Sequence, residues 1–291
     1  MAPVTIVGMI LGSVAVVTLS ARNSGGTPTH EKIVTTGVVS KPVLKARVVN
    51  VTGKDFKFDA PDQIPAGLTE FRFLNKGPSI HHMQILKLTN GKTFADLNAA
   101  LKRQGPPPKW MKEVGGPNAP APGTESNATL MLAPGNYAII CFVDLGGAPH
   151  FTKGMLKPLR VVASTDAVAP NPTPDVTATL FDYNFRLSSP ILAGTRTIKV
   201  ENTGNQIHEL ELLQLAPGKS VSDFLAWEGG SRNTPPPAKP IGGIAGIERG
   251  MSESFTANFT PGNYVFICFV PDAKDSKPHF VHGMTKQFSV K

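Results

Sequence analysis

Two sets of four residues, each in the order His, Cys, His, Met, are the part of this sequence whose types and spacing could do chemistry. They are His81, Cys141, His150 and Met155, and then His208, Cys268, His279 and Met284. The donors are soft, because thiolate favours Cu(I), imidazole serves both oxidation states of copper, and a thioether binds weakly. Each set therefore has the donor types of a trigonal electron-transfer copper site.

The spacing within each set indicates that its members meet at one place. Each Cys ends an apolar run, and the second His and the Met follow within 14 to 16 residues. The first His lies 60 residues before the Cys, in another predicted strand. A Greek-key sandwich brings such strands together at one end. We therefore expect one metal site at one end of each of two sandwiches.

The two sets lie in two copies of one repeat. The second copy follows the first at an offset of 127 residues up to the Cys and 129 after the loop that follows it. The best stretch, PGNYAIICFV at 134–143, matches PGNYVFICFV at 261–270 at eight of ten positions. Other matched pairs are Asp55 and Asp182, Phe58 and Phe185, Gly67 and Gly194, and Gly115-Gly116 and Gly242-Gly243. The repeat predicts two domains, 45–163 and 175–291, joined by a Pro-rich linker at 164–174.

Short strands account for most of each copy. Runs at 47–51, 69–74, 83–87, 128–132 and 137–143 alternate or are apolar and are bounded by Gly, Pro or Asn. One helix interrupts each copy, beginning at the capping boxes Thr93–Asp96 and Ser220–Asp223 and ending before a Pro triplet. The expected fold class is all-β, with two tandem antiparallel Greek-key β-sandwich domains and a short helical insertion in each.

Both copies resemble the cupredoxin (blue copper) family. The residues that carry the resemblance are 75–81, 134–141, His150 and Met155, with the matching set in the second copy. The resemblance implies a cupredoxin-like fold and up to two type 1 copper ions, bound by the two sets named above. Cys-x8-His-x4-Met in the first copy is similar to copper nitrite reductases, whereas the second copy has Cys-x10-His-x4-Met. Many cupredoxins have Asn after the first His to brace the site, and here His82 and Glu209 depart from that pattern.

Three classes of function compete. They are an exported electron carrier, a copper oxidoreductase of nitrite reductase or laccase type, and a metal-free or copper-holding binding module. Those copper enzymes carry further catalytic histidines beside the type 1 Cys, whereas Ile140 and Ile267 precede the cysteines here and no His-x-His pair occurs. We expect an electron carrier and not an enzyme. The departures after the first His keep the binding module open.

The remaining histidines and a thiol pairing have plainer interpretations. His30, His82 and His282 have no counterpart His in the other copy, and we expect them to be solvated loop residues. A disulfide between Cys141 and Cys268 is disfavoured, because each Cys occupies the equivalent place in its own copy.

The net charge of +8 belongs mainly to the first copy. Residues 45–163 carry 15 Lys and Arg against 8 Asp and Glu, whereas residues 174–291 carry 11 of each. This charge favours an acidic redox protein as partner, with a small anion or an anionic membrane surface as alternatives. Nucleic acid is not expected, because the lysines are scattered singly without an aromatic-rich RNA-binding signature.

The N-terminal segment predicts export. Residues 4–21 are uncharged and about as long as a minimal membrane span, so 1–21 is a signal peptide or a membrane anchor. Residues 22–44 are aperiodic and are expected to be a tether. The predicted location is periplasmic or extracellular, either secreted or held at a membrane by 4–21.

Overall fold

The structure is a computed structural model that describes residues 44–103, 105–144 and 146–291. Of these, Leu44–Lys291 form one compact unit. The expected signal peptide or anchor, 1–21, and all but the last residue of the expected tether, 22–44, lie outside the described residues. A search of the described helices finds none with the length and apolar character needed to span a membrane.

Two halves with matching elements follow each other along the chain. We call residues 44–163 the first half and residues 175–291 the second half. The first half contains β1 Arg47–Lys54, β2 Lys57–Asp59, β3 Gln63–Pro65, β4 Gly67–Asn75, β5 Gln84–Leu88, α1 Phe94–Leu101, β6 Met111–Glu113, β7 Glu125–Leu132, β8 Gly135–Ile140, the 3-10 helix η1 His150–Lys153 and β9 Leu156–Val162. The second half contains β10 Val176–Phe181, β11 Asn184–Leu187, β12 Gly194–Asn202, β13 His208–Leu215, α2 Val221–Glu228, β14 Ala238–Ile247, β15 Ser252–Phe259, β16 Gly262–Ile267, the 3-10 helix η2 His279–His282 and β17 Thr285–Val290.

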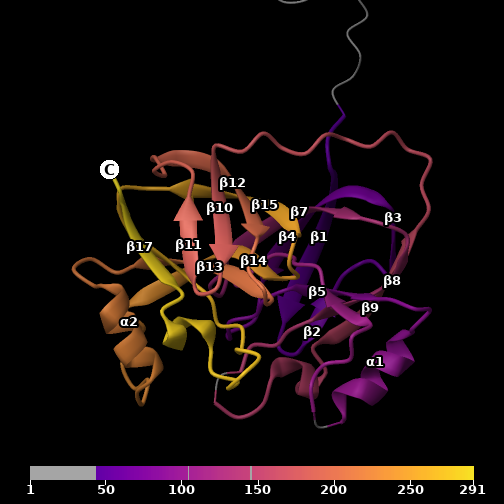
Figure 1. Ribbon diagram of the computed structural model, residues 1–291, viewed down its shortest axis with the longest axis horizontal. Helices are drawn as coiled ribbons and strands as arrows, with labels where there is room; N and C mark the ends of the chain where they lie inside the picture. Colours follow the sequence, from indigo (N-terminus) through magenta and orange to yellow (C-terminus); the bar gives the residue numbers. More distant parts are fainter. Residues whose placement is uncertain (1–43, 104, 145) are drawn as a thin grey trace, which may run out of the picture. The chain divides into compact units, whose positions relative to one another are not determined.

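The first half is a sandwich of two sheets (Figure 1). Strands β2, β1, β4 and β7 lie in one sheet, and β3, β9, β8, β5 and β6 form the other. Val51 and Phe71 from the first sheet share a buried core with Ile85 and Ile139 from the second. Alternation of apolar and polar residues along these strands therefore places one face of each sheet in the core.

The second half repeats this arrangement. Strands β11, β10, β12 and β15 form one layer, and β14, β13, β16 and β17 form the other. Leu180 and Ile198 pack against Leu212 and Phe266 between the layers. The all-β fold class of two Greek-key sandwiches is confirmed.

The helices cover the outer faces of the sheets that carry β5 and β13. Leu97 of α1 is buried with residues of β5 and β8, and Phe224 of α2 is buried with residues of β13 and β16. Thr93 and Ser220 cap the two helices, each in a capping box with an Asp three residues later. The predicted helical insertions and their first residues are confirmed.

The antiparallel pairing expected of these sandwiches has three exceptions among the described strands. Strands β1 and β4 are parallel, as are β10 and β12 and also β3 and β9. After β1 the chain turns back through β2, crosses to the other sheet as β3, and returns to the first sheet as β4. This crossing lets β4 run in the direction of β1, which a tight hairpin could not do.

The halves contact each other through residue pairs that the repeat relates to one another. Adding 127 to the residue of the first half and subtracting 127 from that of the second gives a contacting pair again. Three isolated bridges join the segment 114–120 to β14: Val114 with Ile247, Pro117 with Ile244, and Pro120 with Ile241. A further antiparallel bridge between β7 and β15 joins two layers into one eight-stranded sheet. The contact is therefore approximately twofold, like an isologous dimer interface within one chain. Because 44–291 is one compact unit, the division into separate domains stays a prediction.

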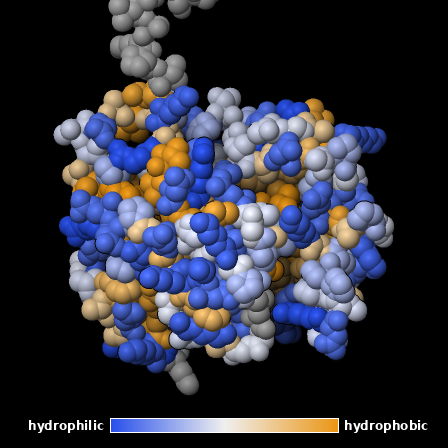
Figure 2. Space-filling view, turned by 180° about the vertical axis from the view of Figure 1, so that it is seen from behind, coloured by the Kyte–Doolittle hydropathy of each residue, from blue (hydrophilic) through white to orange (hydrophobic). Residues whose placement is uncertain are grey.

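The face shown in Figure 2 is mainly polar. On the face seen in Figure 2, hydrophobic residues lie in several small groups among hydrophilic ones. Large hydrophobic side chains that are exposed, such as Met131, Leu192 and Val281, come from separate segments. Scattered exposure of this kind needs no special explanation.

Candidate metal centres

The four predicted ligands of the first half come from three segments. His81 lies in the loop between β4 and β5, and Cys141 directly follows β8. His150 begins η1, and Met155 lies between η1 and β9. All four residues are buried. The loop that follows β8 therefore supplies three of the four.

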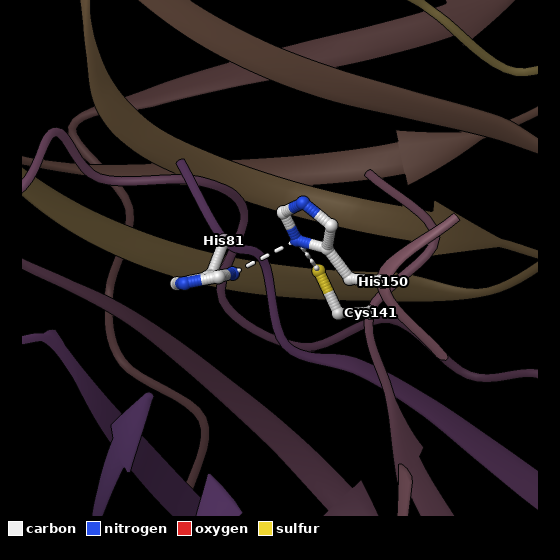
Figure 3. A group of neighbouring side chains, drawn as sticks. All are labelled: His81, Cys141 and His150. Carbon is white, nitrogen blue, oxygen red and sulfur yellow. Dashed lines mark hydrogen bonds between the residues drawn. The ribbon is translucent and has the colours of Figure 1, made fainter. Parts of the chain in front are cut away.

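Three donor atoms converge in the first half (Figure 3). His81 Nδ1 lies 2.9 Å from His150 Nδ1, and Cys141 Sγ lies 3.6 Å from the same His150 nitrogen. All three donor atoms lie within 4.8 Å of one another. Two ring nitrogens this close must share a proton or face a common cation.

The second half places the corresponding residues in the same way. His208 Nδ1 lies 3.0 Å from His279 Nδ1, and Cys268 Sγ lies 3.4 Å from that His279 nitrogen. The loop between Cys268 and His279 is two residues longer than the loop between Cys141 and His150. The donors therefore converge despite the different loop lengths.

Backbone hydrogen bonds tie each Met to the Cys. The Cys141 N–H donates to the carbonyl of Met155 at 3.1 Å, and the Cys268 N–H donates to that of Met284 at 3.3 Å. Met155 and Met284 are fully buried in the same cores as Cys141 and Cys268. Both methionines are thus held beside the cysteines. Their role as axial ligands stays a prediction.

A carboxylate holds the first histidine of each set. Asp55 Oδ1 accepts a hydrogen bond from His81 Nε2, and Asp182 Oδ1 accepts one from His208 Nε2 at 2.6 Å. This bond places the proton on Nε2, so Nδ1 presents its lone pair to the other donors. These aspartates were not among the predicted site residues. Their matched positions in the repeat were the signal that could have identified them.

His82 and Glu209 occupy equivalent positions in the repeat, and each accepts a hydrogen bond from the backbone N–H of the residue that follows the Cys. His82 Nε2 accepts a hydrogen bond from the N–H of Phe142 at 2.8 Å, and Glu209 Oε1 accepts one from the N–H of Phe269 at 2.8 Å. Each bond links the segment of the first His to the residue after the Cys. The expectation that His82 is a solvated loop residue is therefore wrong, because the Phe142 N–H needs a buried acceptor.

Asn118 reaches Glu209 across the contact between the halves. Its Nδ2 donates to Glu209 Oε2 at 3.2 Å and to the carbonyl of Ile244 at 3.3 Å. An asparagine of the first half therefore contacts the residue that follows the first His of the second site.

The other predictions for histidines and cysteines have mixed outcomes. His282 is partly exposed, with Nε2 3.2 Å from Asp275 Oδ1, and His30 lies outside the described residues. Cys141 and Cys268 are free thiols, as expected for two separate sites.

Burial governs the protonation of the converging groups. It raises the pKa of Cys141 to about 12 and that of Cys268 well above its ordinary value. It lowers the pKa of His81, His150 and His208, and lowers that of His279 to about 4. The imidazoles are therefore neutral, which is the ligand form, whereas the thiols need a cation before they ionise at neutral pH.

The donor set fits a soft transition metal. Each group has two neutral imidazole nitrogens and one sulfur within reach of one point, shielded from solvent. Thiolate and imidazole together select copper or zinc rather than calcium or magnesium. These residues could hold copper in either half.

Comparisons with known proteins give structural likeness only. No protein-family model matches the chain, and no curated protein matches it significantly. Reduced auracyanin from Roseiflexus castenholzii is 18% identical over 40% of this chain and 98% of that chain, with a TM-score of 0.28. Auracyanin A, a "blue" copper protein from Chloroflexus aurantiacus, is 20% identical over 40% of this chain and 99% of that chain, with a TM-score of 0.30.

Another similar structure matches most of this chain. A blue copper oxidase from Nitrosomonas europaea is 15% identical over 84% of this chain and 86% of that chain, with a TM-score of 0.26. Auracyanins and an oxidase are thus both among the similar structures. Similarity at this level assigns no function to this chain.

Proposed function

We propose that this chain is an exported copper-binding electron carrier with one type 1 copper centre in each half. The observation that carries the proposal is that two imidazole nitrogens and one sulfur converge, fully buried, in both halves. His81, Cys141 and His150 would bind one ion, and His208, Cys268 and His279 the other. Met155 and Met284 would be the weak axial ligands. Bound copper would supply one-electron exchange between Cu(II) and Cu(I).

The chain holds its donors in place by backbone hydrogen bonds. In the first half the N–H of Phe151 donates to Cys141 O at 3.0 Å, and that of Met155 donates to His150 O at 3.1 Å. The second half has the same two bonds, from Phe280 to Cys268 and from Met284 to His279. A loop locked in this way keeps donor positions constant when the charge of the centre changes. That constancy favours rapid electron transfer.

We propose a carrier rather than an enzyme on the residues beside the cysteines. Ile140 and Ile267 precede them, where the oxidoreductases that the sequence resembles carry a catalytic histidine. Among the described residues, His82 is engaged as a hydrogen-bond acceptor and leaves no set of histidines beside Cys141 for a further copper. The physiological partner would be a redox protein, with an acidic one favoured by the charge of the first half.

The test is a copper titration of the purified protein followed by visible spectroscopy. We expect intense thiolate-to-copper absorption that saturates at two ions per chain. Cys141→Ser and Cys268→Ser should each remove about half of it, and Asp59→Asn, an exposed change on β2, should remove none. A protein that stays colourless and keeps no stoichiometric copper would overturn the proposal.

A further inference from the structure

A third group of ligand-type side chains lies beside the second centre. It consists of Asp272 and Asp275, from the longer loop after Cys268, and His282 at the end of η2. One donor atom from each lies within 4.8 Å of the other two. We call these three residues the loop cluster. Asp275 and His282 are partly open to solvent, so a cation could enter from outside.

Asp272 is a buried carboxylate that is already oriented. Its Oδ2 accepts hydrogen bonds from Tyr183 Oη at 2.5 Å and Gln206 Nε2 at 2.7 Å, and its Oδ1 accepts one from the N–H of Lys274 at 2.8 Å. These three hydrogen bonds hold the carboxylate of Asp272 in one orientation, as an oxygen ligand requires. Within the described ranges, no lysine or arginine forms an ion pair with it. Its negative charge is therefore met only by neutral donors.

An unpaired nitrogen faces this carboxylate. His279 Nε2 is fully buried, has no hydrogen-bond partner, and lies 3.7 Å from Asp272 Oδ2. Buried imidazole nitrogens normally have a hydrogen-bond partner or a metal ion. An unpaired nitrogen beside the oriented carboxylate of Asp272 therefore indicates a place for a bound ligand. This observation is independent of the loop cluster itself, because His279 is not one of its three residues.

The first half provides an internal comparison. Lys153 stands where the second half has His282, and its ammonium lies 4.7 Å from the ring centre of Phe56. Phe56 is the counterpart of Tyr183, whose ring lies 5.0 Å from that of His282. A fixed positive charge thus occupies, in the first half, the place of the His282 imidazole.

We propose that Asp272, Asp275 and His282 bind a divalent cation of the zinc class, at a site separate from the His-Cys-His group of the second half. Two carboxylates and one imidazole are zinc ligands, and the imidazole disfavours calcium and magnesium. The cation replaces the hydrogen bond between His282 and Asp275 and balances the charge of Asp272. It lies next to His279 and thereby neighbours the proposed copper centre. The proposal stands whether or not that centre holds copper.

The experiment is ¹¹³Cd NMR of the full protein, with Cd²⁺ as the probe for zinc. Thiolate-bound and oxygen/nitrogen-bound cadmium have well-separated chemical shifts, so the loop cluster is read independently of both cysteines. We expect one oxygen/nitrogen-type signal per chain at stoichiometric Cd²⁺. Cys141→Ser combined with Cys268→Ser should keep this signal, even if no thiolate-type signal is ever seen.

Two variants decide whether the signal comes from the loop cluster. His282→Lys installs the residue of the first half, and Asp275→Asn removes one carboxylate at the surface. Each should abolish the signal and lower Zn²⁺ affinity at least tenfold in a chelator competition, with an unchanged circular dichroism spectrum. Lys286→Asn, a change on β17, should leave both measurements unchanged. Absence of the signal, or its persistence in His282→Lys and Asp275→Asn, would overturn the proposal.

Discussion

In each site the Nδ1 atoms of the two histidines face each other, but only the first histidine has its Nε2 hydrogen-bonded to a carboxylate. His81 and His208 each donate Nε2–H to an aspartate, whereas His279 Nε2 has no hydrogen-bond partner. The aspartates set the tautomer and the ring orientation of the first histidine, and groups in this position commonly change metal affinity strongly. Asp55 and Asp182 are therefore positioning residues for the proposed centres.

Replacing Asp55 by Asn should weaken metal binding in the first half alone. An amide presents a weaker acceptor to His81 Nε2, so we expect about 10- to 100-fold lower affinity for Cu(I), measured by chelator competition. Asp182→Asn should do the same for the second half, and Asp59→Asn should change neither. Equal affinities in Asp55→Asn and the parent would show that His81 does not need this anchor.

Replacing His82 by Leu should destabilise the first half. The N–H of Phe142 would lose its buried acceptor, which costs about 1–3 kcal/mol in the free energy of unfolding. His82→Gln should recover most of that loss, because Glu209 shows that an oxygen at the end of a side chain of this length can accept the equivalent bond. Urea unfolding measures both variants. A Leu variant as stable as the Gln variant would contradict the assigned role.

Close backbone approach explains the second glycine of each matched pair in the repeat. Gly116 and Gly243 have φ of +116° and +126°. A Cβ would lie 2.2 Å from Met83 O at Gly116 and 2.0 Å from Leu210 O at Gly243. The segment 114–120 and β14 can therefore lie against the strands that follow the first histidines only because neither glycine carries a side chain.

Gly116→Ala should cost more stability than Gly123→Ala. Both positions have positive φ, which alone costs about 1–3 kcal/mol for a residue with a side chain. Gly123 has φ of +78° and no atom within 4 Å of its would-be Cβ, so it reports the backbone strain alone. The excess loss in Gly116→Ala, measured by thermal or urea unfolding, is the cost of the contact with Met83 O together with that of the less favourable φ of +116°. Equal losses would rule out that contact as the limiting factor.

At the scale of the whole molecule, the contact between the halves buries carboxyl groups. Glu211 Oε2 accepts the N–H of Ala119 at 3.1 Å, and Glu253 Oε2 accepts that of Gly116 at 3.1 Å. The Oε1 atoms of both glutamates are buried without a partner. Burial raises the pKa of Glu211 and Glu253 well above the ordinary value. Gln84, the counterpart of Glu211, instead donates to Gly246 O at 2.9 Å.

Glu211→Gln should make the protein less sensitive to rising pH. The folded pKa of Glu211 is raised, so its contribution to stability is complete below the unfolded value of 4.5 and is lost as the pH rises through the folded pKa. We expect urea midpoints that fall between pH 5 and pH 8 in the parent and fall less in Glu211→Gln. At pH 8 the variant should be the more stable by about 1 kcal/mol or more, a usual size for a buried polar group left unpaired. Glu125→Gln, at an exposed position, is the control, and identical pH slopes in all three proteins would refute the expectation.

Features that depend on residue type and short spacing could be predicted without the fold. The two His-Cys-His-Met sets, the strands and the capped helices were predictable, because donor chemistry, period-two alternation and capping boxes are local properties. The 127-residue offset also identified the repeated elements. The three parallel strand pairs were not predicted, because alternation of apolar and polar residues does not specify the direction of a neighbouring strand.

The side chains that complete the sites could not be predicted, because they come from distant segments that meet only in the folded chain. Asp55 reaches His81 across 26 residues, and Asn118 reaches Glu209 across 91. The orphaned His279 Nε2 and the buried Glu211 likewise arise from contacts between distant segments. A polar side chain looks the same in sequence whether it is solvated, as was expected of His82, or buried against one backbone N–H. The difference is made by the packing of the strands, which sets the partner and the desolvation of each group.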